Sequence, residues 1–160
     1  MLVVSNTSPI LNLAIVGQLD LLRQQFGQIQ IPPAVIDELK IVEDRPGSQS
    51  IQDAVNAGWI QVQSVRNQSF VQLLRQTLDR GEAEAISLAL ELQAQLILLD
   101  ERDGRKVAKS LDLQVTGVLG VLLRAKESGK LPSLQPTIEE LTQKAGFWIA
   151  PELMAKILQA

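Results

Sequence analysis

The side chains of this sequence that could do chemistry are carboxylates and one amide. The 160-residue chain contains neither histidine nor cysteine, which excludes the commonest general base, the commonest zinc ligand and any thiolate site. Hard oxygen ligands without histidine or cysteine favour Mg²⁺ or Mn²⁺ over zinc. The candidates are Asn6, Glu82, Asp100 and Asp103. If the protein is an enzyme, we expect it to work with acids and a divalent cation.

Short apolar runs alternate with helical segments along the chain, and these elements must position the acids. The expected strands are Leu2–Val4, Ile29–Ile31, Trp59–Val62, Leu96–Leu99 and Gln114–Val115. The expected helices are 10–14, 19–25, 34–39, 51–56, 70–78, 82–92, 100–111 and 119–127, with two more after Leu131. Such alternation implies right-handed crossovers and a mostly parallel sheet covered by helices on both faces. The sequence therefore predicts an α/β fold, a three-layer α/β/α sandwich.

Length and composition indicate one domain over 1–160, with 131–160 as a C-terminal helical extension. The hydrophobic content of 46% provides one sizeable core. The N-terminus lacks the pattern of a signal peptide and no apolar run could span a membrane, so we expect a cytoplasmic protein. The net charge of −3 argues against nucleic-acid binding through bulk positive charge. It leaves a nuclease open, because clustered metal-binding acids would themselves make the balance negative.

Three separate segments are expected to deliver the acids to one edge of the sheet. In an open parallel sheet, ligands bind outside the carboxyl ends of the strands. Asn6 follows the first strand and Asp100 follows the strand at 96–99. The crossover helix that leads into the strand at 96–99 begins at the same edge of the sheet. Glu82 lies at the start of this helix and is therefore expected at that edge. Several carboxylates in one place repel one another unless a cation offsets their charge.

Helical phase separates neighbouring acids, because residues three, four and seven positions apart share a face. Glu82 falls on the apolar side of its helix, whereas Glu84 is expected on a mixed, outer side. In the next helix Asp103 aligns with Val107 and Leu111 and is expected to face the pocket. The basic side chains of that helix suit phosphate contacts, although a charged run is more often a solvated face. They are Arg102, Arg105, Lys106 and Lys109, of which Arg102, Arg105 and Lys109 are expected to point outward.

Each candidate also has a purely structural interpretation. Asp79 with Glu82, and Asp100 with Asp103, have the spacing of a capping box. Ser8, followed by a proline, is expected to cap the first helix, and Asn6 is an alternative cap. Taken singly, these capping roles are favoured, and only the shared location of the acids shifts the balance towards a metal site.

The apolar segment Phe147-Trp148-Ile149 near the C-terminus has two interpretations. It could seal the core or contact a partner. The core interpretation is preferred.

An ordered set of motifs resembles the PIN domain family, in particular a PIN-like subgroup similar to the VapC-type toxin nucleases of toxin–antitoxin pairs. The motifs are Val4-Ser5-Asn6-Thr7-Ser8-Pro9, Pro33-Ala34-Val35-Ile36-Asp37-Glu38-Leu39, Gly81-Glu82-Ala83-Glu84-Ala85-Ile86 and Leu98-Leu99-Asp100-Glu101-Arg102. The family's acidic positions correspond to Asn6, Glu38, Glu82, and Asp100 with Asp103. The resemblance thereby adds Glu38, which the residues alone suggest is a solvated acid. Where the family has an aspartate this chain has Asn6, whose amide oxygen can ligate a metal but brings no charge.

The resemblance implies a PIN-like fold and a Mg²⁺- or Mn²⁺-dependent endoribonuclease that is the toxin of such a pair. It also implies an RNA substrate, a small antitoxin partner and a homodimer. Residues expected to contact the substrate are Thr7, Ser8, Arg102, Arg105 and Lys106. Two alternatives stay open: a catalytically weak or inactive PIN-like module that binds RNA or protein, and a receiver-type phosphoacceptor domain using Asp100. The second lacks the paired acids after the first strand that such chemistry uses.

Overall fold

A computed structural model describes residues 1–159 and contains a five-stranded sheet in the order β3-β2-β1-β4-β5. Every strand pairing is parallel. The strands are β1 (Val3–Ser5), β2 (Ile29–Ile31), β3 (Ile60–Val62), β4 (Leu96–Leu98) and β5 (Val115–Thr116). The helices are α1 (Thr7–Ile15), α2 (Asp20–Phe26), α3 (Pro33–Leu39), α4 (Ser48–Asn56), α5 (Gln68–Leu74), α6 (Arg80–Glu91), α7 (Arg102–Ser110), α8 (Val118–Glu127), α9 (Gln135–Lys144) and α10 (Pro151–Gln159). The predicted α/β/α sandwich with a parallel sheet is confirmed.

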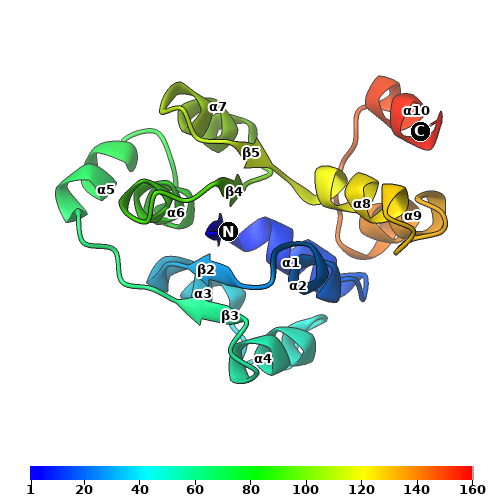
Figure 1. The fold of residues 1–160 in the computed structure, drawn as a ribbon, viewed down its shortest axis with the longest axis horizontal. Coiled ribbons are helices and arrows are strands. Elements are labelled where there is room, and N and C mark those ends of the chain that lie inside the picture. The colour runs from blue at the N-terminus through cyan, green and yellow to red at the C-terminus, as the bar shows by residue number, and fades with distance from the viewer. Residues whose placement is uncertain (160) are drawn as a thin grey trace.

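Two apolar clusters cover the two faces of the sheet. Val4, Ile97 and Leu99 point into a cluster with α5, α6 and α7. Val3 and Leu98, their neighbours in sequence, point to the opposite face, which packs on α1, α2, α4, α8 and α9. This alternation is the period of two of a strand that is buried on both faces. Figure 1 shows α5 and α6 on one side of the strands and α1, α2, α8 and α9 on the other.

The start of α1 differs from the prediction. Asn6 occupies the N-cap, so that the helix begins at Thr7, and Ser8 and Pro9 lie inside its first turn. The Asn6 side chain makes no capping hydrogen bond. It is therefore available for other contacts. Over residues 1–159, every helix is too short or too polar to span a bilayer.

The prediction that Glu84 faces outward is wrong. Glu84 is buried, with 6% of its surface exposed. Its Oε1 accepts a hydrogen bond of 3.0 Å from the N–H of Ala34 in the first turn of α3, and its Oε2 accepts one of 2.9 Å from Arg80 Nε. A carboxylate is favourable at a helix N-terminus, where backbone N–H groups have no helical partner. Glu84 thus joins α3 to α6, the two helices that carry Glu38 and Glu82.

We expect Glu84→Ala to lower the free energy of unfolding by about 1–3 kcal/mol, because it leaves the buried Ala34 N–H without a partner. Asp37→Ala is the matched control. It removes only the exposed 3.3 Å ion pair between Asp37 and Arg80, which should contribute less than about 1 kcal/mol. Urea denaturation measures both. Equal losses in the two variants would contradict the capping role.

Candidate functional site

Asn6 lies at the carboxyl end of β1, beside the end of β4. Its N–H donates to the Leu98 carbonyl at 2.9 Å, which extends the β1–β4 pairing by one step. The side chain is 3% exposed, and its Nδ2 donates to Glu101 Oε2 at 3.4 Å. Within residues 1–159, Asn6 Oδ1 is buried without a hydrogen-bond partner. The amide oxygen of Asn6 is therefore free to bind a ligand.

Glu82 combines a structural role with a free oxygen. The capping box with Asp79 is confirmed: Glu82 N–H donates to Asp79 Oδ1 at 2.8 Å, and Glu82 Oε1 accepts from the Asp79 N–H at 3.4 Å. Glu82 Oε2 is buried and has no partner among the described residues. A Cβ added at Gly104 of α7 would lie 2.5 Å from this atom. Only glycine at position 104 leaves Glu82 Oε2 in its present place.

The two carboxylate oxygens of Asp100 also differ in their contacts. Asp100 Oδ1 accepts a 3.0 Å hydrogen bond from the N–H of Val118, the first residue of α8. Asp100 Oδ2 is buried and unpartnered in the part of the chain that the structure describes. Asp100 therefore caps α8 and does not form the predicted capping box with Asp103, since α7 has Glu101 at its N-cap and no side-chain cap.

Glu101 was not predicted, and it connects the site. Its two oxygens accept hydrogen bonds from Asn6 Nδ2 and, at 2.6 Å, from Ser8 Oγ. Its charge also acts on Glu82 and Asp100, since it raises the pKa of both. A signal for Glu101 existed in the sequence, because it shares a helical face with Gly104 and Ala108, which are buried.

Glu38 reaches the same edge of the sheet from α3. Thr7 Oγ1 donates to Glu38 Oε2 at 2.5 Å. A Cβ added at Gly81 would lie 2.7 Å from both Glu38 oxygens. Glu38 is thus held between Thr7, next to Asn6, and Gly81, next to Glu82. The structure therefore places Glu38, which only the resemblance had suggested, beside residues that adjoin Asn6 and Glu82, although its side chain is exposed.

Two placements in α7 need correction. Asp103 is exposed and lines a separate shallow hollow with Leu78 and Lys106, so the structure does not bring it to the other acids. Arg105 does not point outward. It is half-buried, and its Nη1 donates to the Leu99 carbonyl at 2.9 Å. Arg102 and Lys109 are exposed as expected, and Lys106, for which no direction was predicted, is exposed as well.

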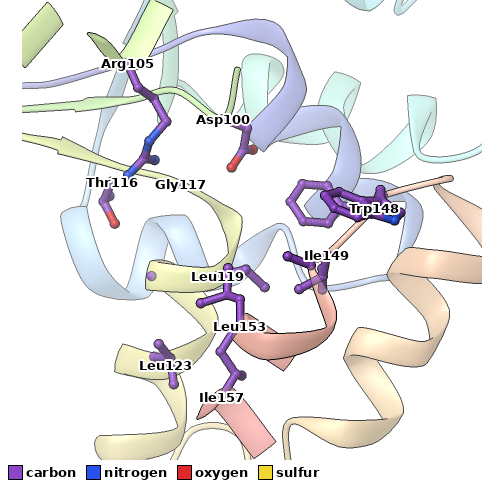
Figure 2. A pocket seen from close by; sticks show the side chains of 13 residues that line it. Asp100, Arg105, Thr116, Gly117, Leu119, Leu123, Trp148, Ile149, Leu153 and Ile157 are labelled. Carbon is purple, nitrogen blue, oxygen red and sulfur yellow. The ribbon is translucent and has the colours of Figure 1, made fainter. Parts of the chain in front are cut away.

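A cavity of about 450 Å³ opens beside Asp100. Asp100, Arg105 and Thr116 form its polar part, while α8, the segment 147–150 and α10 supply a mostly apolar lining. Figure 2 shows the Asp100 carboxyl and the Trp148 ring bordering this hollow. Asn6, Glu38 and Glu82 are not part of its lining. Of these four candidate residues, Asp100 alone lines the cavity.

Burial makes the two central carboxyl groups hard to ionise. Burial is the main cause that raises the pKa of Glu82 from 4.5 to about 7. The side-chain hydrogen bond and charge of Asp79 and the charge of Glu101 contribute to this increase, whereas the hydrogen bond from the Asp79 N–H opposes it. Burial also raises the pKa of Asp100 from 3.8 to about 6; Glu101 adds to the increase, whereas the Val118 N–H and Arg105 oppose it. A nearby cation would favour the charged form of both.

The donor atoms suit a hard divalent cation. Three of them, Asn6 Oδ1, Glu82 Oε2 and Asp100 Oδ2, are buried oxygens without partners among residues 1–159. Oxygen donors of this kind are those that Mg²⁺ and Mn²⁺ select. Over the same residues, no group of three or more acidic side chains is already gathered closely enough to form a metal site. The donor types, two carboxylates and one amide oxygen, are therefore those that would bind Mg²⁺ or Mn²⁺.

In a metal-free buffer with EDTA, we expect the wild-type protein to lose stability as pH rises from about 4.5 to about 7. Over this interval the folded state binds more protons than the unfolded state at Glu82, so the free energy of unfolding falls with pH. Glu82→Gln keeps the capping acceptor and removes the charge. It should be more stable than the wild type above this interval by about 1–3 kcal/mol.

Urea denaturation of both proteins across this pH range measures the difference. Asp100 contributes in the same direction in both proteins, so the comparison isolates Glu82. The same pH dependence in the variant and the wild type would rule out a raised pKa for Glu82.

The comparison with known families agrees with the geometry. A family model described as a PIN domain matches residues 2–160. No curated protein matches the sequence. Because the match covers almost the whole chain, and the chain has the parallel sheet and the acids at its edge, this protein belongs to the PIN domain family.

Proposed function

We propose that this protein is a Mg²⁺- or Mn²⁺-dependent endoribonuclease that hydrolyses phosphodiester bonds of RNA. The observation that carries the proposal is the set of three buried, unpartnered oxygens of Asn6, Glu82 and Asp100 among residues 1–159. Leaving such atoms unpaired is unfavourable, and a bound cation would offset the cost. Membership of the PIN family supports the proposal, because the PIN domain is a nuclease-type fold.

The proposed acidic cluster comprises Asn6, Glu38, Glu82, Asp100 and Glu101, and each of these residues has a distinct task in the proposal. Asn6, Glu82 and Asp100 hold the cation through their free oxygens, and Glu38 and Glu101 provide further negative charge nearby. A divalent cation bound there would activate water for attack and stabilise the negative charge that develops on the phosphate. Asp103 is given no task as a ligand, because it lies in a different hollow.

In this proposal the hydroxyl groups of Thr7 and Ser8, which follow Asn6, hold the carboxylates of Glu38 and Glu101 in position. Thr7 Oγ1 donates to Glu38 and Ser8 Oγ donates to Glu101. These hydrogen bonds orient the two exposed acids towards the cluster. We therefore assign Thr7 and Ser8 a positioning role in place of the expected substrate contact.

Cationic side chains of α7 are the proposed contacts for RNA phosphates. Arg105 lines the cavity beside Asp100. Arg102 and Lys106 are exposed on the same helix, and exposed cations suit sequence-independent phosphate contacts. An antitoxin partner and a homodimer are part of the proposal and rest on the resemblance to toxin nucleases. A cytoplasmic location is proposed with them.

A cleavage assay on mixed RNA with Mn²⁺ tests the site. Glu82→Gln and Asp100→Asn should each reduce the rate by about 100-fold or more, since each removes a charged ligand. Asp103→Asn is the matched control, because it makes the same change on an exposed residue outside the cluster; it should cleave like the wild type. Equal rates in all four proteins would remove the proposed site.

A second candidate function is a PIN module that binds RNA or protein without catalysis. The observation that favours it is the hydrogen bond from Asn6 Nδ2 to Glu101. An aspartate could not donate this bond, so the amide stabilises the acidic cluster without a cation. A module that has no use for the metal would benefit from such a replacement.

Asn6→Asp separates the two candidates. The new carboxylate would repel Glu101, so we expect lower stability in EDTA and tighter Mn²⁺ binding. A nuclease with a weak site should also cleave faster than the wild type at low Mn²⁺, whereas a binding module should stay inactive. Asn56→Asp is the matched control, because Asn56 is exposed at the end of α4. Calorimetric Mn²⁺ titration and RNA cleavage provide the two measurements.

A further inference from the structure

Trp148 is exposed although its neighbours are packed. It is 78% exposed, while Ile149 is 8% exposed and Phe147 packs against the main core. The prediction that the whole segment seals the core is therefore wrong for Trp148. The chain has only five aromatic residues, two of them tryptophan. An exposed ring of this size leaves a large apolar area in water. Trp148 also lines a cavity, so a ligand in that cavity could cover the ring.

The cavity beside Trp148 has two chemically different ends. Asp100 and Arg105 form a charged end, and Asp100 carries a buried oxygen without a partner in the described chain. Leu119 and Ile149 belong to the apolar lining near the indole, as Figure 2 shows. A ligand that fills this cavity must combine a charged group with a flat apolar group. The cavity has a volume of about 450 Å³, which lies in the range of pockets that hold small organic groups.

A nucleotide has this combination of groups. Its phosphate is charged, its base is a flat ring system, and a sugar separates the two. Stacking of a base on an aromatic side chain is tolerant of sequence, because every base has a π face. In a duplex the faces of a base are covered by its neighbours, so only an unpaired base can reach such a ring.

We propose that Trp148 is a stacking platform for one unpaired base of the RNA, adjacent to the phosphate at the Asp100 end of the cavity. The base at this position is then bound with little sequence preference. This inference deepens the proposed endoribonuclease function and rests on it for the identity of the ligand. Trp148 is a positioning residue in this scheme, because it holds the substrate and touches no reacting atom.

The test measures RNA binding without cleavage. The protein carries Glu82→Gln, and the probes are a single-stranded oligoribonucleotide, a set of copies each with one abasic position, and a duplex of the same sequence. Trp59, the other tryptophan, is 8% exposed, so quenching of the exposed tryptophan fluorescence reports Trp148. We expect the single strand to quench it and the duplex to leave it unchanged.

Substitutions then isolate the ring. Trp148→Leu should weaken binding of the single strand by about tenfold, and Trp148→Phe should retain most of the affinity. One abasic position should weaken binding to the parent protein by a similar factor and have no further effect on Trp148→Leu, since the two changes remove the same contact. Leu158→Ala, which truncates another exposed apolar side chain of this region, is the control and should bind normally.

The outcomes distinguish this inference from the function on which it rests. If the wild type cleaves RNA with Mn²⁺ but Trp148→Leu binds normally and no abasic position couples to it, the nuclease stands and the platform is overturned. If the coupling is observed and the wild type never cleaves, the platform stands and the nuclease is overturned. Absence of quenching by any RNA would also overturn the platform and leave Trp148 for a protein partner.

Discussion

The parallel pairing of β1 with β4 is the constraint on which the site depends. It sets Val3, Val4 and Ser5 opposite Leu96, Ile97 and Leu98, and the Asn6 N–H continues the ladder to the Leu98 carbonyl. Both strands therefore end at the same edge, and the polar residues that follow them meet there. At this edge the Glu84 carboxylate of α6 also accepts a hydrogen bond from the Ala34 N–H in the first turn of α3 and so joins these two helices. A site assembled from distant segments thus depends on one strand pairing and one buried capping interaction.

Much of this arrangement follows from sequence, because the signals are local. The strand Ile29–Ile31 lies where it was predicted, and the capping box of Asp79 with Glu82 was an explicit alternative that the structure confirms. The edge location of Glu82 and Asp100 followed from the rule for parallel sheets. The motif resemblance located Glu38, which has no physical signal of its own.

The errors share a physical origin, which is the use of large apolar residues to define the buried side of a helix. In α7 the buried positions are Gly104 and Ala108, so Glu101 faces the cluster and Asp103 does not. In α6 the burial of Glu84 is stabilised by the N–H of Ala34, fifty residues away in sequence. Helical phase contains no information on a polar partner at that distance. Small residues at a close helix contact, and carboxylates that cap a different helix, are the two cases that phase alone misjudges.

The different roles of the two Asp100 oxygens have a consequence for how the protein could bind and release a cation. One oxygen accepts a hydrogen bond from the first backbone N–H of α8, and the other has no partner among residues 1–159. A cation could therefore arrive and leave through the free oxygen while the helix start stays anchored. Because α8 also forms a wall of the neighbouring cavity, that wall would keep its shape throughout. In the metal-free protein the cavity would then already have the shape that binds RNA.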